Sequence, residues 1–228
     1  MATSVTLESL LNQLRLEVGD STNPALGLAR TGIYKQYLER TQKRLYEDFN
    51  WPQLIVDREQ TLQKGERYYT FPADLDFSKI NRAWVYWNNN WNPIKCGFDP
   101  VTYNDSNPAL NTRSDPIQVW RYYETNQFEV WPMPAASSQV IRFRGMKTLD
   151  RLTADSDRAV LDDTLLVLYS AAELLARSKA EDAPAKLSQA QNHYLKLKSR
   201  LIKSQPFIIG GGMQTFRNHD DQLRVNPL

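Results

Sequence analysis

The residues that could support catalysis or bind a metal are few in this sequence. The two histidines are His193 and His219, and the single cysteine is Cys96. His219 precedes two aspartates that could supply metal ligands, but no second histidine stands at a spacing that would complete such a site. Cys96 lies in a strand-like run, without a partner in the sequence that would activate it as a nucleophile. We therefore predict that the protein is not an enzyme and holds no metal and no cofactor.

The charged residues are spread evenly along the chain. There are 28 basic and 26 acidic residues, and residues 51–150 carry 11 of each. A dedicated DNA-binding domain would concentrate lysine and arginine, so this distribution argues against one and favours protein partners. The sequence has no run of about 18 uninterrupted apolar residues, so we expect no membrane-spanning segment.

Apolar residues at helical spacing predict two helices before residue 50 and two after residue 157. The first helix ends at Gly19, and the second runs from about Arg30 to Phe49 because Trp51-Pro52 prevents its continuation. The third follows Asp157, and the fourth begins near Pro184 and ends near Lys203. The four predicted apolar stripes are Leu7, Leu10, Leu11, Leu14 and Val18; Tyr34, Leu38, Leu45 and Phe49; Leu161, Leu165, Leu168, Ala172 and Leu175; and Leu187, Ala190, Tyr194, Leu197 and Leu201.

Between the two pairs of helices the apolar period changes to two. Short runs rich in aromatic and β-branched residues predict seven strands, which lie within residues 53–62, 66–71, 79–87, 91–97, 117–123, 127–131 and 140–147. Strands of this length and spacing are typical of an antiparallel sandwich or barrel. The long polar loop from Asp99 to Asp115 interrupts them, and loops of this length are commonly functional.

The order of elements predicts an α+β fold. Isolated helix pairs bury too little surface to be stable, so we expect the N- and C-terminal pairs to form one four-helix bundle from residues 1–50 and 151–205. The antiparallel β-sandwich or barrel of residues 51–150 would be inserted into this bundle. Residues 206–228 show no period and would form an extended C-terminal arm.

Five of the six tryptophans lie in the strand region, at positions 84, 87, 91, 120 and 131. We expect most of them to fill the β core. Trp84 and Trp87 are three residues apart, so in a regular strand they would face opposite sides of the sheet. An exposed tryptophan beside Asn88, Asn89 and Asn90 would suit a protein interface or a carbohydrate site. The carbohydrate alternative requires two exposed tryptophans on one face, for instance Trp87 and Trp91.

The C-terminal arm carries apolar residues that no helix or strand of its own would bury. These are Phe207, Ile208, Ile209, Met213 and Phe216. The three glycines at 210–212 lack the lysine and the following helix of a phosphate-binding loop, so they are interpreted as a hinge. Such an arm either folds back on the helical bundle or inserts into a partner protein, and the pattern favours the partner.

Three long stretches of the sequence resemble a known family. They are "RLYEDFNWPQLIVDREQTLQKGERYYTFPADL", "RSDPIQVWRYYETNQFEVWPMPA" and "IRFRGMKTLDRLTADSDRAVLDDTLLVLYSAAELLA". They are similar to the head–tail connector, or adaptor, proteins of tailed bacteriophages, the group that includes tail tubular protein A. The resemblance extends over roughly residues 30 to 205.

The resemblance implies a structural virion protein of the neck, assembled in the host cytoplasm. Such adaptors form a twelve-membered ring under the portal protein and extend its channel, through which double-stranded DNA passes without specific binding. The helices would dock on the portal, with the arm residues Phe207, Ile208, Ile209, Met213, Phe216 and Arg217 inserted between its subunits. The β domain would face the tail nozzle or the next neck protein and contact it through Asn88, Asn89, Asn90 and Trp91.

Overall fold

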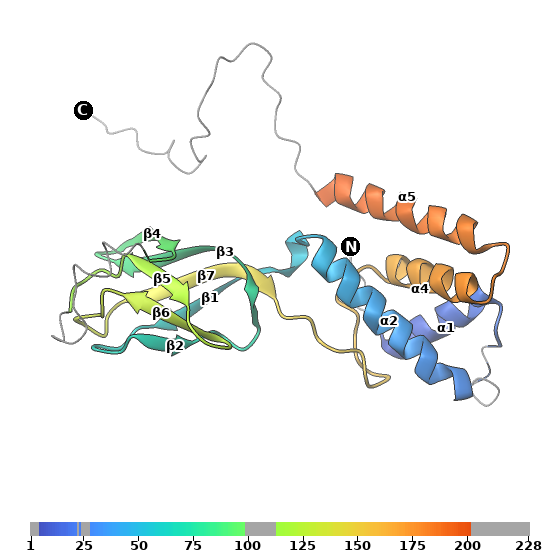
Figure 1. Ribbon diagram of the computed structural model, residues 1–228, viewed down its shortest axis with the longest axis horizontal. Coiled ribbons are helices and arrows are strands. Elements are labelled where there is room, and N and C mark those ends of the chain that lie inside the picture. The colour runs from blue at the N-terminus through green and yellow to red at the C-terminus, as the bar shows by residue number, and fades with distance from the viewer. Residues whose placement is uncertain (1–4, 22, 24–27, 99–112, 202–228) are drawn as a thin grey trace, which may run out of the picture.

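The molecule is elongated, with the helices gathered at one end and the strands at the other (Figure 1). The computed structural model describes residues 5–21, 23, 28–98 and 113–201. The elements are α1 (Leu7–Val18), α2 (Leu28–Asp48), the short 3-10 helix η1 (Pro52–Leu54), β1 (Ile55–Thr61), β2 (Tyr68–Thr70), β3 (Leu75–Trp87), β4 (Asn90–Cys96), β5 (Val119–Tyr122), β6 (Gln127–Trp131), β7 (Val140–Lys147), α4 (Asp163–Arg177) and α5 (Ala183–Leu201). The four predicted helices and seven predicted strands are all present, so the α+β class is confirmed.

The first helix shows why the local pattern was sufficient to predict it. Thr6 caps its N-terminus by accepting a hydrogen bond from the Ser9 amide. Gly19 closes its C-terminus in the left-handed conformation, with φ of 80°, which glycine adopts without strain. The predicted leucine stripe is buried against α2 and α4. None of the helices in the described part of the chain is both long and apolar enough to cross a membrane.

The helical core is built mainly by three of the four helices. α1, α2 and α4 supply most of its buried side chains, together with Leu152, Ala159 and Leu161 from the segment that returns from the strands. α5 packs against α4 on the outside, and its buried residues are Ala183 and Ala190 alone. The expected four-helix bundle is therefore not confirmed, because α5 covers the core with half-buried residues instead of sharing it.

The strands form one curled sheet in the order β1-β7-β3-β4-β5-β6-β2. All neighbours are antiparallel except β4 and β5, which pair in parallel. The expectation of an antiparallel sandwich or barrel is thus met only in part, since the seven strands make a mixed half-barrel. A parallel pair requires a long crossover, and the 22 residues from 97 to 118 that join β4 to β5 are long enough to provide one.

Arg58 lies on β1, an edge strand of this sheet, and it points toward the inside of the half-barrel. It is paired in the ladder with Phe143, which is fully buried. Its guanidinium binds the carboxylate of Asp74 in the β2–β3 connection, with Nε 2.8 and 2.9 Å from the two oxygens. An inward charge on an edge strand discourages pairing with other chains, and this ion pair also ties the edge strand to the residue that directly precedes β3.

The concave side of the sheet holds a second hydrophobic core that is rich in aromatic rings. Phe71 packs within 4.8 Å of Phe128 and 5.2 Å of Phe143, and Trp120 lies 5.0 Å from Phe143, between ring centroids. Edge-to-face and tilted pairs of this kind add to the stabilisation from apolar burial. This core shares no buried residue with the helical core.

We predict that Phe128→Ala destabilises the protein by about 3–5 kcal/mol, because it removes a ring from the centre of this cluster. Urea unfolding followed by tryptophan fluorescence would measure the change. Phe77→Ala is the matched control, since Phe77 is 40% exposed, and its cost should be about 1 kcal/mol or less. Equal losses in the two variants would contradict the assignment of Phe128 to the core.

Candidate functional site

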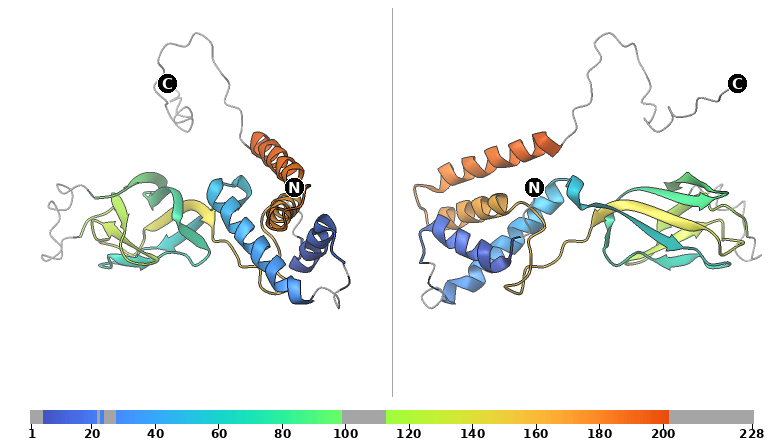
Figure 2. Two further views of the ribbon diagram at one scale, coloured as in Figure 1. Left: turned by 45° about the vertical axis from the view of Figure 1, so that its right-hand side comes forward. Right: turned by 180° about the vertical axis from the view of Figure 1, so that it is seen from behind.

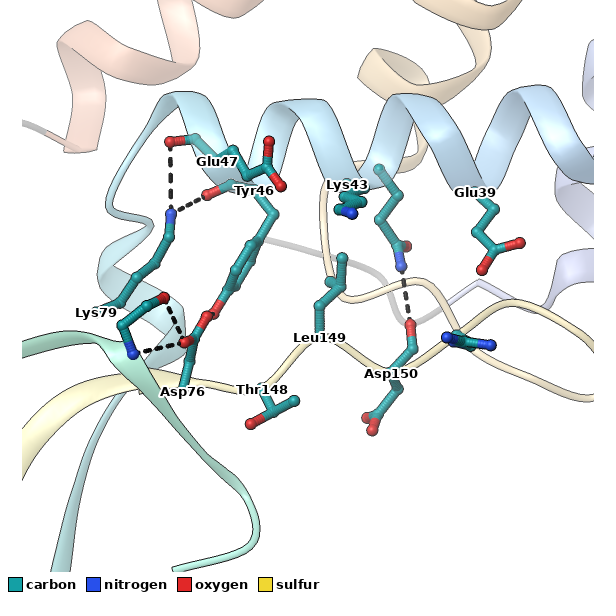
Figure 3. Close-up of a pocket in the computed structure, with 12 residues that line it drawn as sticks. Glu39, Lys43, Tyr46, Glu47, Asp76, Lys79, Thr148, Leu149 and Asp150 are labelled. Atoms are coloured by element: carbon teal, nitrogen blue, oxygen red, sulfur yellow. Dashed lines mark hydrogen bonds between the residues drawn. The ribbon is translucent and has the colours of Figure 1, made fainter. Parts of the chain in front are cut away.

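The C-terminus of α2 is held by side chains that come from outside the helix. Carbonyl groups in the last turn of a helix have no partner within it. Trp51 Nε1 donates to the Leu45 carbonyl at 2.8 Å. Lys79 of β3 donates from Nζ to the carbonyls of Tyr46 and Glu47 at 2.5 and 3.4 Å (Figure 3). The positive charge of Lys79 also opposes the negative end of the helix dipole.

Tyr46 makes the reciprocal contact, from α2 to the strands. Its hydroxyl lies 2.8 Å from a carboxylate oxygen of Asp76 and 3.0 Å from the Lys147 carbonyl. Lys79 Nζ lies 4.4 Å from the centroid of the Tyr46 ring. Burial of the ring raises the pKa of the Tyr46 phenol, and the neighbouring Asp76 carboxylate raises it further. The phenol therefore stays protonated, and the hydroxyl of this helical residue can donate a hydrogen bond to the strands.

A cleft of about 380 Å³ opens beside these contacts, between α2, the start of β3 and residues 148–151 (Figure 3). Gln42 lines it and donates from Nε2 to the Asp150 carbonyl at 3.1 Å. Both acidic and basic side chains line the cleft, including Glu39, Lys43 and Arg151. In the part of the chain that the structure describes, no group of three metal-ligating side chains is present. The contacts of Tyr46 and Lys79 at this junction connect α2 to β3, and we call it the α2–β3 joint.

The segment that returns from the strands is also anchored on both sides. The Thr148 amide donates to the Asp74 carbonyl at 2.9 Å, beside the sheet. At its other end, the carbonyls of Asp157 and Asp155 accept from the Leu7 and Glu8 amides, at 2.8 and 3.2 Å. The return segment therefore pairs directly with the start of α1, so the N-terminal helix and the strands are connected through it.

The β3–β4 hairpin forms the tip at which a tail contact was expected. Asn88 and Asn89 have φ of 49° and 59°, the positive values that a tight type I′ turn requires and that asparagine tolerates. Asn88, Asn89 and Asn90 are exposed, and Trp91 is half-buried. The register pairs Tyr86 with Trp91 and Trp87 with Asn90. Trp87 and Trp91 thus face opposite sides of the sheet, and the paired platform that a carbohydrate site would need is not formed.

The outer face of the sheet carries ion pairs between arginine and acidic side chains. Arg144 Nε lies 2.8 Å from an Asp57 oxygen, and Arg142 Nε lies 2.9 Å from a Glu59 oxygen, across the β1–β7 ladder. The guanidinium of Arg142 covers Trp91, at 3.7 Å from the ring centroid. The Arg144 guanidinium holds the pKa of Asp57 below its usual range. The arginines therefore occupy aromatic faces that a ligand would use.

A matching family model supplies the biological context. The model described as SU10 adaptor protein matches residues 5–216 of the chain. The chain belongs to the SU10 adaptor protein family. No curated protein matches the chain.

Membership of this family identifies the chain as a phage structural adaptor protein, which agrees with the resemblance to head–tail adaptors. Its expected arm residues, Phe207, Ile208, Ile209, Met213, Phe216 and Arg217, lie outside the described residues, as do His219 and most of the loop 99–115. The described part of the chain places His193 on α5, with Nε2 2.8 Å from Asp162, the residue that caps α4. Cys96 is an exposed strand residue.

The tryptophans of the adaptor are distributed differently from the expectation. Trp120 and Trp131 are buried, whereas Trp84, Trp87 and Trp91 are half-buried. The expectation that most of the five fill the core was therefore wrong. Trp84 and Trp91 lie on the outer face under arginines, and these arginines could not be assigned to tryptophans without the strand register.

Sequence reasoning also missed the charge that the adaptor buries in β6. Glu129 is fully buried between Arg67 and Arg121, which both form ion pairs with it. A buried carboxylate must be paired to offset its loss of hydration. The available signal was the single acidic residue within the otherwise apolar core of the run "QFEVW".

We predict that Lys79→Met lowers the free energy of unfolding by about 1–2 kcal/mol, because two helix carbonyls lose a charged donor while the aliphatic stem is kept. Lys43→Met is the matched control. Lys43 lines the same cleft and makes no ion pair among the described residues, so its loss should change stability by no more than about 0.5 kcal/mol. Chemical denaturation of both variants would test this, and equal effects would argue against the joint.

We also predict a change in acid stability from Asp157→Asn. The Ala154 and Thr153 amides donate to the Asp157 carboxylate at 2.7 and 2.8 Å, and they lower its pKa. A carboxyl group whose pKa is lowered by folding stabilises the protein at pH values above the ordinary carboxyl pKa. This stabilisation is lost as the pH falls toward and through the lowered pKa of the folded protein. Between about pH 5 and about pH 2, the variant should therefore lose stability less steeply than the wild type. Denaturation at a series of pH values would measure this slope, and an unchanged slope would contradict the assignment.

Proposed function

We propose that the protein is the head-to-tail adaptor of a tailed phage, which forms a ring under the portal and extends its DNA channel. The observation that carries this proposal is the family match over residues 5–216. The form of the molecule supports it. An adaptor must present different surfaces to two partners, and this chain has a helical end and a β end, each with its own core (Figure 1).

In this proposal the helical part, residues 1–50 and 151–205, docks on the portal protein. The arm of residues 206–228 inserts between portal subunits through Phe207, Ile208, Ile209, Met213, Phe216 and Arg217. Its sequence combines large apolar side chains with three consecutive glycines, a composition that suits a hinged segment buried by a partner.

The β domain, residues 51–150, would face the tail nozzle or the next neck protein. The β3–β4 tip supports this assignment, since a tight turn presents three exposed amide side chains next to Trp91. Asn88, Asn89, Asn90 and Trp91 are proposed as the contact with the tail component. Tight turns on paired strands are rigid, so such a tip can bind without a large loss of conformational entropy.

The ring is proposed to have twelve subunits and to sit in the neck of the virion after assembly in the host cytoplasm. Double-stranded DNA would pass through it without specific binding. The even charge of the chain supports this, because a channel wall dense in lysine and arginine would hold the phosphates and impede sliding.

The proposal predicts a stable complex with the portal protein encoded nearest to this one. We expect the full-length chain to co-purify with that portal as a stoichiometric ring visible by electron microscopy. A chain that ends at Gln205 should lose the complex. A full-length variant with Phe207→Ser, Ile209→Ser and Phe216→Ser should lose it too, because the buried apolar side chains are replaced while the length is kept.

Two controls make the result decisive. Substitution of Asn88, Asn89 and Asn90 by serine should leave the portal complex intact, because these residues lie at the other end of the molecule. Both truncated and full-length chains should show the same far-ultraviolet circular dichroism per helical residue. A full-length chain that remains monomeric with the portal would overturn the proposal.

A further inference from the structure

A groove lies at the end of the molecule opposite the strands, where α1 ends, α2 begins and α4 ends (Figures 1 and 2). Its volume is about 310 Å³. The apolar side chains that line it are Val18 of α1, Ile33 of α2 and Leu174 of α4. Leu174 is buried, whereas Ile33 is 39% exposed. Together with Arg30 and Arg177, these residues define what we call the tip groove.

The guanidinium groups of the tip groove are available to a further carboxylate. Arg177 is the last residue of α4, is exposed, and forms no ion pair with any residue that the structure describes. Arg30 binds Asp20, with Nη1 3.0 and 3.1 Å from the two oxygens, but its side chain stays 65% exposed. Among the described residues, no acidic side chain lines the groove. The groove therefore combines apolar and positively charged side chains.

The carboxylate of Asp20 is shared among several groups. It accepts a hydrogen bond from the Tyr34 hydroxyl in addition to its contact with Arg30. The Tyr34 hydrogen bond lowers the pKa of Asp20, and Arg30 and Arg15 lower it further. Arg15 is 6% exposed and donates its side-chain hydrogen bonds to neutral groups, so it lacks an ion pair within the described part of the chain. Asp20 thus offsets only part of the positive charge of these arginines, and the tip groove keeps an excess of positive charge.

A carboxylate next to an apolar side chain complements the tip groove. Guanidinium groups bind carboxylates through two parallel hydrogen bonds, and this pairing gains strength where apolar side chains exclude water. The groove lies at the lower end of the volumes typical of ligand pockets, so its size suits a side chain or two. Arginines, and pockets that receive an anchoring side chain, dominate the binding energy of protein interfaces. The expected occupant is therefore a protein segment with Asp or Glu beside a large apolar residue.

The position of the tip groove distinguishes between the partners of an adaptor. The molecule is elongated, with the helices at one end and the strands at the other (Figure 1). In a ring whose subunits extend from the portal to the tail, the sides of each subunit face its neighbours, and the two ends face the portal and the tail. The tip groove lies at the helical end, which the proposed function assigns to the portal.

We infer that the tip groove binds an acidic, apolar segment of the portal protein. An apolar side chain of that segment packs against Val18, Ile33 and Leu174. The carboxylate beside it pairs with Arg177 and Arg30. This contact is separate from the proposed insertion of the arm between portal subunits. The inference rests on the proposed function and deepens it, since it names portal-binding residues within the described helices.

Charge changes in the groove test this contact. In the full-length chain, Arg177→Glu should weaken binding to the portal by about tenfold or more, because the new carboxylate repels that of the portal segment. Ile33→Asp should weaken binding by a similar factor, because it places a charge among the apolar side chains. Titration of fluorescently labelled adaptor with the portal measures the Kd, and far-ultraviolet circular dichroism checks that each variant is folded.

Two substitutions on α5 are the matched controls. Arg200→Glu makes the same charge change in the last turn of a helix, at an exposed arginine that has no ion pair among the described residues. Leu195→Asp introduces an acid at an apolar residue that is 61% exposed. Both should change the Kd by about twofold or less, because neither residue lines the groove.

Chemical cross-linking identifies the occupant. In an Arg177→Lys chain bound to the portal, a carbodiimide should join the new amine to a portal Asp or Glu beside a large apolar residue, as located by mass spectrometry. Arg200→Lys should give no such product. A mixture of light and heavy-isotope adaptor chains reveals links between copies. A link from position 177 to a second adaptor chain, or no portal peptide at that position, overturns the assignment to the portal.

The two proposals fail separately. A wild-type chain that does not bind the portal overturns the adaptor function and this contact with it. If the wild type binds but Arg177→Glu and Ile33→Asp bind equally well, the contact in the tip groove is refuted and the adaptor function stands. Loss of affinity in the groove variants alone, with a portal peptide cross-linked at position 177, supports the contact.

Discussion

The connection between the helices and the sheet depends on the side chains that donate hydrogen bonds to the last carbonyl groups of α2. A helix end inside a protein leaves carbonyl groups that must find donors. Here the donors are the Trp51 indole and the Lys79 ammonium, which belong to the chain after the helix and to the third strand. The same contacts that satisfy the helix therefore join it to the sheet. Tyr46 adds a bond in the opposite direction, to Asp76. An adaptor that must hold two partners in register needs such a joint, because a free hinge there would uncouple its two ends.

The aromatic residues divide into three groups with different physical roles. Phe71, Trp120, Phe128 and Phe143 fill the curl of the sheet and stabilise it. Trp84 and Trp91 lie on the outer face, where Arg144 and Arg142 cover their rings and the same arginines pair with Asp57 and Glu59. Their surfaces are thus already engaged inside the molecule. Tyr68 and Tyr123 form a third group, since they pack on each other at 4.3 Å between centroids and yet stay about half exposed.

Much of the fold could be predicted because its signals are local. Thr6, the leucine stripe and Gly19 define α1 by themselves, and the asparagines at 88 and 89 supply the positive φ values of a tight turn. Less of the candidate site could be predicted. Lys79 is 32 residues from Glu47, and Arg142 is 51 residues from Trp91. No periodicity relates such pairs, so neither the joint nor the covered tryptophans could be read from spacing.

The sequence by itself determined the number, type and order of the helices and strands, the even charge and the family. It could do so because the 3.6- and 2-residue periods, the caps and the turns act over a few neighbouring residues. The tertiary structure decided the parallel pairing of β4 with β5, the outside position of α5, the burial of Glu129 between two arginines and the opposite placement of Trp87 and Trp91. Each of these depends on which distant segments meet and in what register, and a shift of one residue in a strand would turn every side chain to the other face.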